Sequence, residues 1–450
     1  MTRRFPVTTV LSIMLCASQT LAQHALTLEA SKQLAVQNNA QVKNSALERE
    51  AAQQTRKAAL TKYFPSISAG GAMFEAQKNL MEISTQGGNL PVYDGKDLAS
   101  LQTATEFAYM PASTMGLMKS GTVGMVTAVQ PVFAGGRIVN GNKLASLGED
   151  VSEYKNRMAR NDVLLQTEEQ YWRLVSLNEK LKTIQAYEDM LESLLRQVQD
   201  AFDAGLVLRN DLLKVRLKQS EVLLNMSKLE NGKKLAEMAF CQHIGIPYDS
   251  TLVLADTLSV GGHPEGYYVE HKEALERRAE YMLLQASVRA EGLQSSMKLG
   301  EYLPQVGVGV SGLYMKLDEA KGRTVGMVFG TVSIPLSSWW EASHTLQERS
   351  AKEQMAENIM RDRSELLLLQ MEKARRDMTD AYAQYALSME AREQAEENLK
   401  LNSDSYRSGL TTVSDLLEAQ ALLQQSQDGL TDAKAQYVVK MTTYLQVTGR

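Results

Sequence analysis

The sequence is poor in cysteine, proline and aromatic residues, and each shortage excludes a class of structure. It has 2 cysteines, 9 prolines and 6% aromatic residues in 450 positions. Cys16 lies in a segment that we expect to be removed on export, so the mature chain keeps only Cys241 and has no intrachain disulfide. A composition rich in Ala, Leu, Glu, Gln, Lys and Arg is typical of long helices that pack through narrow apolar stripes.

Long apolar runs and excess positive charge are also missing. Beyond residue 22, no stretch approaches the roughly 18 apolar residues of a transmembrane helix. The formal net charge is −5, which argues against nucleic acid as a partner, because phosphate neutralisation needs a basic face. No nucleophile elbow, phosphate loop, His-Glu-x-x-His or Cys-x-x-Cys motif occurs, so we expect no enzymatic activity and no cofactor.

Residues 1–22 predict an export signal. Two arginines precede a short apolar stretch over 10–17, and the Thr-Leu-Ala sequence ending at Ala22 is typical of a cleavage site. A lipoprotein signal is disfavoured because Leu15 stands before Cys16, where a small residue is expected. The sequence therefore predicts an exported protein.

The rest of the chain contains an internal repeat. Residues 202–213 and 406–417 align without a gap: each begins with an aromatic residue, has Gly-Leu three positions later and ends in Asp-Leu-Leu. Repetition means that one supersecondary unit is used twice. The predicted domains are therefore a first repeat over 23–260 and a second repeat over 261–450.

Each repeat predicts the order helix, strand, strand, long helix, helix. In the first repeat these elements are expected at 26–60, 66–74, 121–133, 141–204 and 211–245. In the second they are expected at 267–300, from 305, at 324–335, at 341–408 and from 411 onward. The segment 77–120 has no sustained periodicity and predicts a long loop. Gly205 and Gly409 are expected to end the two long helices as C-caps.

The lengths of these elements predict how they assemble. Two shorter helices of about 34 and 38 residues, placed end to end, match one long helix of about 65 residues, giving a layer on the order of 100 Å high. The strands alternate between apolar and small or polar residues, as in a closed barrel in lipid. Four strands are too few to close a barrel, so we expect cyclic symmetry; three copies would supply about twelve strands.

Three sequence patterns, together with the duplicated order of elements, resemble the TolC family of outer membrane efflux proteins. The resemblance extends over essentially the whole mature chain. The patterns are Leu26-Thr27-Leu28-Glu29-Ala30 followed by Asn38-Asn39, the Pro-hydrophobic-Phe-x-Gly-Gly sequence within Gln130–Arg137, and Tyr406-x-x-Gly409 followed by Asp415-Leu416-Leu417-Glu418-Ala419-Gln420. The resemblance implies a mainly α fold with a small β part. A homotrimer would share one β-barrel in the outer-membrane lipid and form a helical tunnel through the periplasm.

This resemblance also implies a function and partners. The family's members are passive exit ducts that receive substrates from an inner-membrane transporter through a periplasmic adaptor, or membrane fusion, protein. In this sequence Thr411 stands where many members have a basic residue that helps to hold the periplasmic tip closed. The 77–120 segment is longer than is common in the family. In the second repeat, the connection from the last strand to the long helix lacks the Gly-Gly turn.

The resemblance places the functional residues at the periplasmic tip. The lumen would be narrowed by the acidic residues Asp211, Asp415 and Glu418. Adaptor docking would involve Gly205, Leu206, Tyr406, Gly409 and Leu410. Carboxylates at a helix start also cap orphan amides and suit the helix dipole, so capping and lumen gating both remain open for Asp415.

Other classes of protein fit the sequence less well. A non-porous periplasmic or surface coiled coil would show unbroken heptads, which the duplicated strand pairs interrupt. An ordinary diffusion porin would not be mostly helical. The methionines near the 77–120 segment are better explained as flexible apolar side chains that fill space than as ligands of copper or silver. The histidines are not spaced as metal ligands are, so we expect no metal site.

Overall fold

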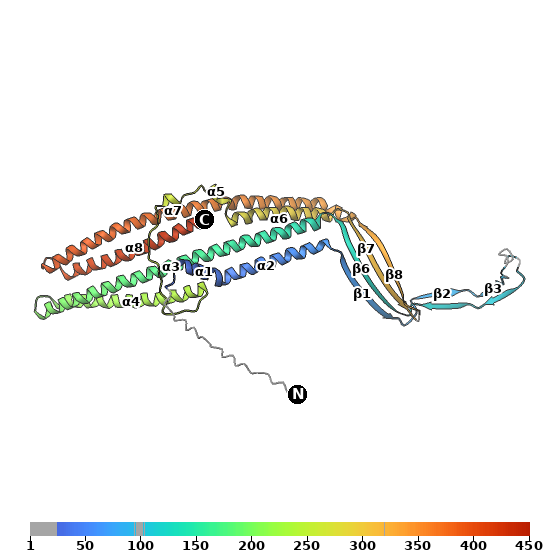
Figure 1. Ribbon diagram of the computed structural model, residues 1–450, viewed down its shortest axis with the longest axis horizontal. Helices are drawn as coiled ribbons and strands as arrows, with labels where there is room; N and C mark the ends of the chain where they lie inside the picture. The colour runs from blue at the N-terminus through green and yellow to red at the C-terminus, as the bar shows by residue number, and fades with distance from the viewer. Residues whose placement is uncertain (1–24, 94, 96–101, 103, 319) are drawn as a thin grey trace, which may run out of the picture. The chain divides into compact units, whose positions relative to one another are not determined.

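The structure is a computed structural model that describes the chain except for residues 1–24, 94, 96–101, 103 and 319 (Figure 1). The predicted export signal lies outside the described residues. The first half contains α1 Leu28–Asn38, α2 Ala40–Leu60, β1 Ser66–Glu75, β2 Met81–Thr85, β3 Gly88–Pro91, β4 Phe107–Met110, β5 Ser113–Leu117, β6 Ser120–Ala134, α3 Arg137–Asp203 and α4 Arg209–Ile244. The second half contains α5 His271–Leu275, α6 Ala279–Glu301, β7 Gln305–Leu317, β8 Arg323–Ser333, α7 Trp339–Arg407 and α8 Val413–Val447.

The chain divides into two compact units. The helical unit comprises the residues up to Glu50 together with Val151–Gln285 and Ile359–Arg450. The sheet unit comprises Ala51–Asp150 and Ala286–Asn358. Each unit takes segments from both sequence repeats, and the long helices α3 and α7 contribute to both.

The two long helices are confirmed. α3 has 67 residues and α7 has 69, close to the predicted lengths. Strong helix formers fill both, and neither contains an internal proline, so nothing in their backbones forces a break. None of the helices in the described part of the chain is long and apolar enough to cross a membrane.

The four expected strands form one antiparallel sheet in the order β1-β6-β7-β8 (Figure 1). Several glycines lie under aromatic rings of the neighbouring strand: a Cβ at Gly309 would meet the ring of Phe329, and one at Gly121 would meet Phe74. A bulge in β6 falls between Pro131 and Phe133, where proline offers no amide to the ladder.

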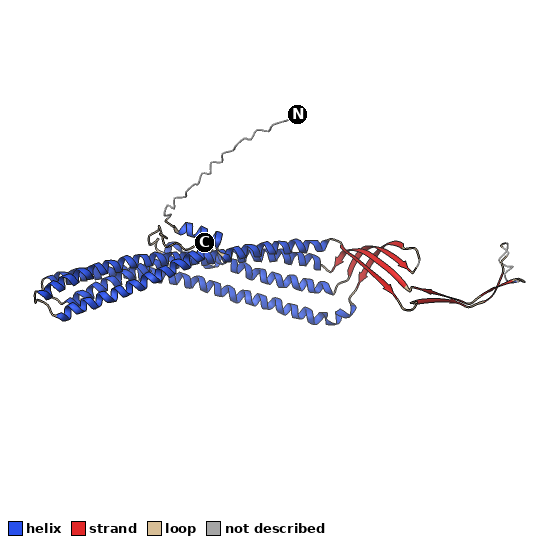
Figure 2. Ribbon diagram, turned by 90° about the horizontal axis from the view of Figure 1, so that it is seen from below, coloured by secondary structure: helices blue, strands red, loops and turns tan. Residues whose placement is uncertain are grey.

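The expected loop over 77–120 is wrong. It contains two antiparallel ribbons, β2 with β5 and β3 with β4, which continue from the β1–β6 hairpin (Figure 2). Ile83 lies opposite Met115 in a period-two pattern only five residues long, too short to stand out in the sequence. The point where the ribbons leave the β1–β6 hairpin is held by Asp318. Its carboxylate accepts hydrogen bonds from the backbone amides of Met118 and Ser120 at 2.8 and 2.7 Å.

The first helices of both repeats are interrupted, contrary to the prediction of single helices over 26–60 and 267–300. Asn39 has an extended backbone between α1 and α2; its Oδ1 accepts the Gln41 amide at 2.8 Å, and its Nδ2 donates to the His243 carbonyl at 2.9 Å. In this way α2 begins beside the end of α4. In the second repeat the chain leaves the helix between α5 and α6, where the buried Arg278 pairs with Glu280 at 2.6 Å.

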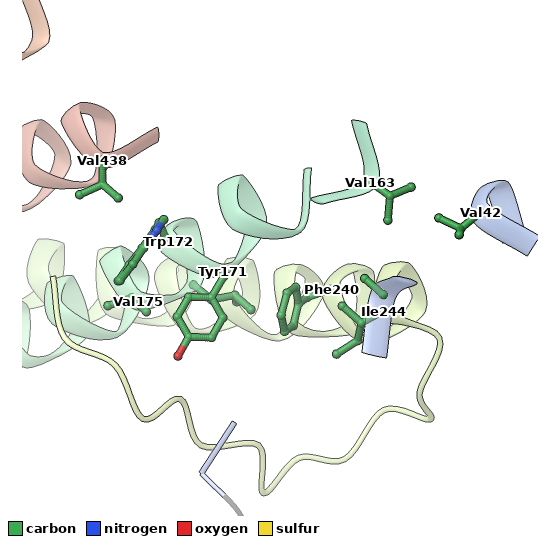
Figure 3. Packing of buried hydrophobic residues seen from close by; sticks show 10 residues of the cluster. Val42, Val163, Tyr171, Trp172, Val175, Phe240, Ile244 and Val438 are labelled. Carbon is green, nitrogen blue, oxygen red and sulfur yellow. The ribbon is translucent and has the colours of Figure 1, made fainter. Parts of the chain in front are cut away.

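The helical unit has an apolar cluster beside the interruption between α1 and α2 (Figure 3). Tyr171 and Trp172 of α3 and Phe240 of α4 are buried, with Tyr171 edge-on to both other rings. The Tyr171 hydroxyl lies 2.8 Å from Asp256 Oδ2 and 2.9 Å from the Leu26 carbonyl oxygen, and its single proton is shared between these two acceptors. These hydrogen bonds attach the segment between the repeats to the helices. Burial of each of the large side chains of the cluster contributes about 1.5–3 kcal/mol to the free energy of folding.

Candidate functional site at the helix turns

The turns between α3 and α4 and between α7 and α8 have the same backbone conformation. Gly205 and Gly409 have φ values of +76° and +73°. In each turn the amide of the next leucine bonds to the carbonyl five residues earlier at 2.8 Å, which is the Schellman arrangement. A Cβ at either glycine would meet nothing within 4 Å. Glycine is therefore favoured by the left-handed backbone alone, as predicted for a C-cap.

Both turns lie at the same end of the helical unit and share one apolar cluster (Figure 1). Its buried members are Leu194, Val198, Leu212, Val215, Val413 and Leu416. The two aromatic residues that open the repeated segments, Phe202 and Tyr406, are partly buried against it. The cluster therefore joins α3, α4, α7 and α8 into one tip.

Asp415 belongs to a capping box at the start of α8. Its Oδ2 accepts hydrogen bonds from the Thr412 hydroxyl at 2.6 Å, the Thr412 amide at 3.0 Å and the Thr411 hydroxyl at 2.8 Å. The Thr412 hydroxyl in turn accepts the Asp415 amide at 3.3 Å. The Thr412 hydrogen bonds, then that of Thr411, lower the pKa of Asp415 to about 2. This carboxylate is exposed and ionised at physiological pH.

Asp211, the matching residue of the first repeat, lies in the first turn of α4 close to Tyr406 of α7. Burial and the carboxylate of Asp211 raise the pKa of the Tyr406 hydroxyl. Lys214, one helical turn further along α4, lies 3.5 Å from Asp211 Oδ1. The Lys214 ammonium also donates to Ser414 Oγ of α8 at 2.8 Å. The structure thus brings Asp211 and Tyr406 together and adds Lys214 to them.

The leucines of both turns are directed to solvent. Leu206 and Leu410 are 79% and 82% exposed, whereas the side chains a turn away are buried in the cluster. Glu418 is also exposed, one turn after Asp415 on α8. An apolar side chain exposed on each turn, next to a buried cluster, gives the tip two equivalent apolar projections.

The sequence matches the family described as outer membrane efflux protein over residues 32–245 and 271–450. The chain belongs to this family. It is an outer-membrane efflux duct of a tripartite system, located in the outer membrane of a Gram-negative bacterium. Membership also implies oligomerisation and association with adaptor and inner-membrane components. The duct interpretation is confirmed over that of a non-porous coiled coil.

Solved structures share the fold of this efflux protein at low sequence identity. The outer membrane protein VceC of Vibrio cholerae is 15% identical, with a TM-score of 0.73 over 94% of this chain and 96% of that one. The Campylobacter jejuni CmeC outer membrane channel is 13% identical, with a TM-score of 0.73 over 94% and 85%. The Neisseria gonorrhoeae MtrE channel, in its open state, is 13% identical, with a TM-score of 0.75 over 94% and 88%. No curated protein matches the sequence.

Sequence reasoning on the efflux protein missed Lys214, Thr412 and Ser414. The Thr412-x-x-Asp415 spacing is itself a capping-box signal, so the role of Thr412 was detectable. The contact between Lys214 and Ser414 joins positions 200 residues apart in different repeats, and no local pattern announces it.

Proposed function

We propose that the efflux protein is a homotrimer in which three copies of the β1-β6-β7-β8 sheet close one transmembrane barrel of about twelve strands. This proposal rests on the two open edges of the sheet. Within the described residues, the edge strands β1 and β8 each form hydrogen bonds with a neighbouring strand on one side only. In lipid every backbone group needs a partner, so β8 of one copy would pair with β1 of the next.

The outer face of the sheet supports this arrangement. Along β7, Gly307 and Gly309 are buried and alternate with exposed Val308 and Val310. Val310 lies opposite Val328 of β8, and the two side chains are 51% and 83% exposed. Directly paired residues point to the same face, so an apolar surface is left without cover in one chain. Lipid acyl chains are the partner that such a face fits.

The helix turns would form the periplasmic tip of the trimer. Threefold symmetry would bring three copies of Asp211, Asp415 and Glu418 around one axis at the narrow part of the lumen, where their like charges would attract cations and resist closure. The projecting Leu206 and Leu410 would supply the apolar contacts on which the adaptor docks. Substrates delivered by the inner-membrane transporter would then leave passively through the duct.

The stoichiometry is tested by measuring the mass of the full-length protein extracted from outer membranes in mild detergent. Three protomers are expected, and heating should dissociate them with a change in migration on gels. A stable monomeric barrel contradicts the shared sheet. Ion conductance of the purified oligomer in planar bilayers tests the duct separately, because a non-porous coiled coil would assemble without conducting.

A further inference from the structure

A cavity of about 600 Å³ lies in the sheet unit, at the end of the sheet where α2 leads into β1 and β6 leads into α3 (Figure 1). Its walls are formed by these four elements together with residues from α6 and β7. Cavities that bind small molecules in proteins measure roughly 300–1,000 Å³ and are lined mainly by apolar side chains. The volume therefore suits one organic molecule of modest size.

The register of the sheet decides on which face the cavity lies. Pro131 of β6 and Gln305 of β7 both line it, and Pro131 pairs with Gly307, two positions after Gln305. Residues two apart on a strand share a face, so the cavity lies on the face opposite to Val308 and Val310. In the proposed barrel the valine face meets lipid. The cavity then belongs to the inner face, which lines the duct.

Two cationic side chains line this cavity, and no acidic residue is among its described lining residues. Lys62 lies in the turn that follows α2, and Arg137 is the first residue of α3. Within the part of the chain that the structure describes, neither forms an ion pair; Arg137 Nε donates to the Ala134 carbonyl at 3.4 Å. The first turn of α3 also lacks an acidic residue, so no side chain there offsets the positive end of the helix dipole. An anionic group fits these surroundings.

The apolar part of the lining gives a second requirement for a ligand. Phe64, Ile138 and Met297 contribute to it from three different elements, and Phe64 is 66% exposed. Gly141 of α3 adds open space, because a Cβ there would meet only Met297 Cε at 3.6 Å. An apolar wall beside two unpaired cations fits a molecule that has an apolar body and one anionic group.

We propose that this cavity is a binding site for amphipathic organic anions that pass through the duct. The anionic group binds between Lys62 and Arg137, and the apolar body lies against Phe64 and Met297. This inference rests on the proposed barrel and names a class of substrate for it. Binding is weak and reversible, because Lys62 is exposed to water, and a duct needs sites from which its substrates can leave.

The experiment titrates full-length trimers in non-ionic detergent by calorimetry, with naphthalene-2-sulfonate as the probe. Its sulfonate stays charged at every working pH, and its two rings match the size of the cavity. Naphthalene-2-sulfonamide has the same rings without the charge, and inorganic sulfate has the charge without the rings. We expect the probe to bind about tenfold more tightly than either control ligand. In planar bilayers, the probe should interrupt the ion current of the wild-type channel.

Two substitutions test the cations. Lys62→Gln and Arg137→Gln should each weaken binding of the probe about tenfold, because each removes a charge-assisted contact. Lys57→Gln is the matched control: Lys57 is exposed on α2, five residues before Lys62, and does not line the cavity. This control should bind the probe as wild type does.

A third substitution separates binding from a structural role. Gly141→Leu fills the cavity and keeps both cations, so it should abolish binding of the probe. Leucine also has a higher helix propensity than glycine, so the trimer should melt at the wild-type temperature or above. A loss of binding in a trimer of undiminished stability is what a ligand site predicts and a packing defect does not.

The contrary outcomes are distinct. Equal binding of the probe and the sulfonamide, or equal weakening by Lys57→Gln and Lys62→Gln, would overturn the proposed anion site. If wild type does not bind the probe and Gly141→Leu loses trimers, the cavity is filled by a neighbouring copy, for which the 84% exposed Trp340 after β8 is available. Wild-type trimers that conduct without binding the probe overturn this inference alone. Trimers that do not conduct overturn the duct proposal and, with it, the assignment to transported molecules.

Discussion

Gly135 and Gly300 contact each other backbone to backbone where β6 turns into α3 and α6 ends. A Cβ added at Gly135 would overlap the carbonyl oxygen of Gly300, and one added at Gly300 would overlap the carbonyl oxygen of Gly135. Gly135 also has a φ of +64°. The Gly-Gly turn found in the sequence is therefore required by a close approach of two chain segments as well as by backbone conformation.

We predict that Gly135→Ala strongly reduces the amount of trimer in the outer membrane, because backbone overlap and left-handed strain add to a cost of about 2–4 kcal/mol. The control is Gly136→Ala. Gly136 has a φ of +76°, but a Cβ there meets only Asn140 Nδ2 at 3.7 Å. It should cost about 1 kcal/mol and leave trimers visible on unheated gels. Equal losses in the two variants would mean that the contact with Gly300 is unimportant.

Gly409→Val should leave trimers at normal abundance but abolish export and adaptor cross-linking. The space around Gly409 is open, so the substitution strains the turn without a clash and shifts the direction of Leu410. Gly409→Asn is the control, because asparagine tolerates the left-handed region, and it should retain most export. If the valine variant exports like wild type, the turn is only a connector and docking occurs elsewhere.

Asp415→Ala combined with Glu418→Ala should lower the cation preference of the channel in planar bilayers, because threefold symmetry multiplies the lost charge. Thr412→Ala separates this effect from capping: it removes the N-cap, at about 1 kcal/mol, and keeps both carboxylates. Unchanged selectivity in correctly assembled double-variant trimers would leave capping as the sole role of Asp415.

The pH dependence of this selectivity follows from the low pKa of Asp415. Its folded-state pKa of about 2 lies below the ordinary value of 3.8, so its capping bonds stabilise the tip fully above about pH 4. That contribution is lost as pH falls through about 2. In a Glu418→Ala channel, the cation preference that remains comes from the Asp415 carboxylate. This preference should therefore persist when the bilayer measurement is made at about pH 3.5. Loss of that share near pH 5 would contradict the capping geometry.

Asp428→Asn should raise the melting temperature of the trimer at about pH 8 and leave it unchanged at about pH 4. Burial is the main cause that raises the pKa of Asp428 to about 6. The negative charge of Asp432 raises this pKa further, whereas the positive charge of Lys180 lowers it. Because the folded-state pKa lies above 3.8, ionisation above about pH 6 costs stability, and asparagine removes that cost. Asp432→Asn should act in the opposite direction, since Asp432 accepts from Lys180 at 2.6 Å. A lower melting temperature for Asp428→Asn at about pH 8 would show that its charge is needed.

Local patterns of the sequence determined the long helices, the glycine caps and the main sheet. α3 and α7 follow from unbroken runs of helix formers, and Gly205 and Gly409 follow from the left-handed conformation that a helix end requires. The alternation of glycine and valine in β7 places each residue on one face without reference to the rest of the fold. The family patterns were likewise readable because they are contiguous.

Contacts between distant segments decided what the sequence left out. The helical pattern over 26–60 continues through Asn39, and the break there is fixed by His243, 204 residues away. The ribbons within 77–120 depend on an antiparallel register and on Asp318, which belongs to the other repeat. Lys214 and Ser414 meet only because the two turns share one apolar cluster. Periodicity and backbone conformation are properties of neighbouring residues, whereas each of these features depends on which distant group lies close enough to accept or donate a hydrogen bond.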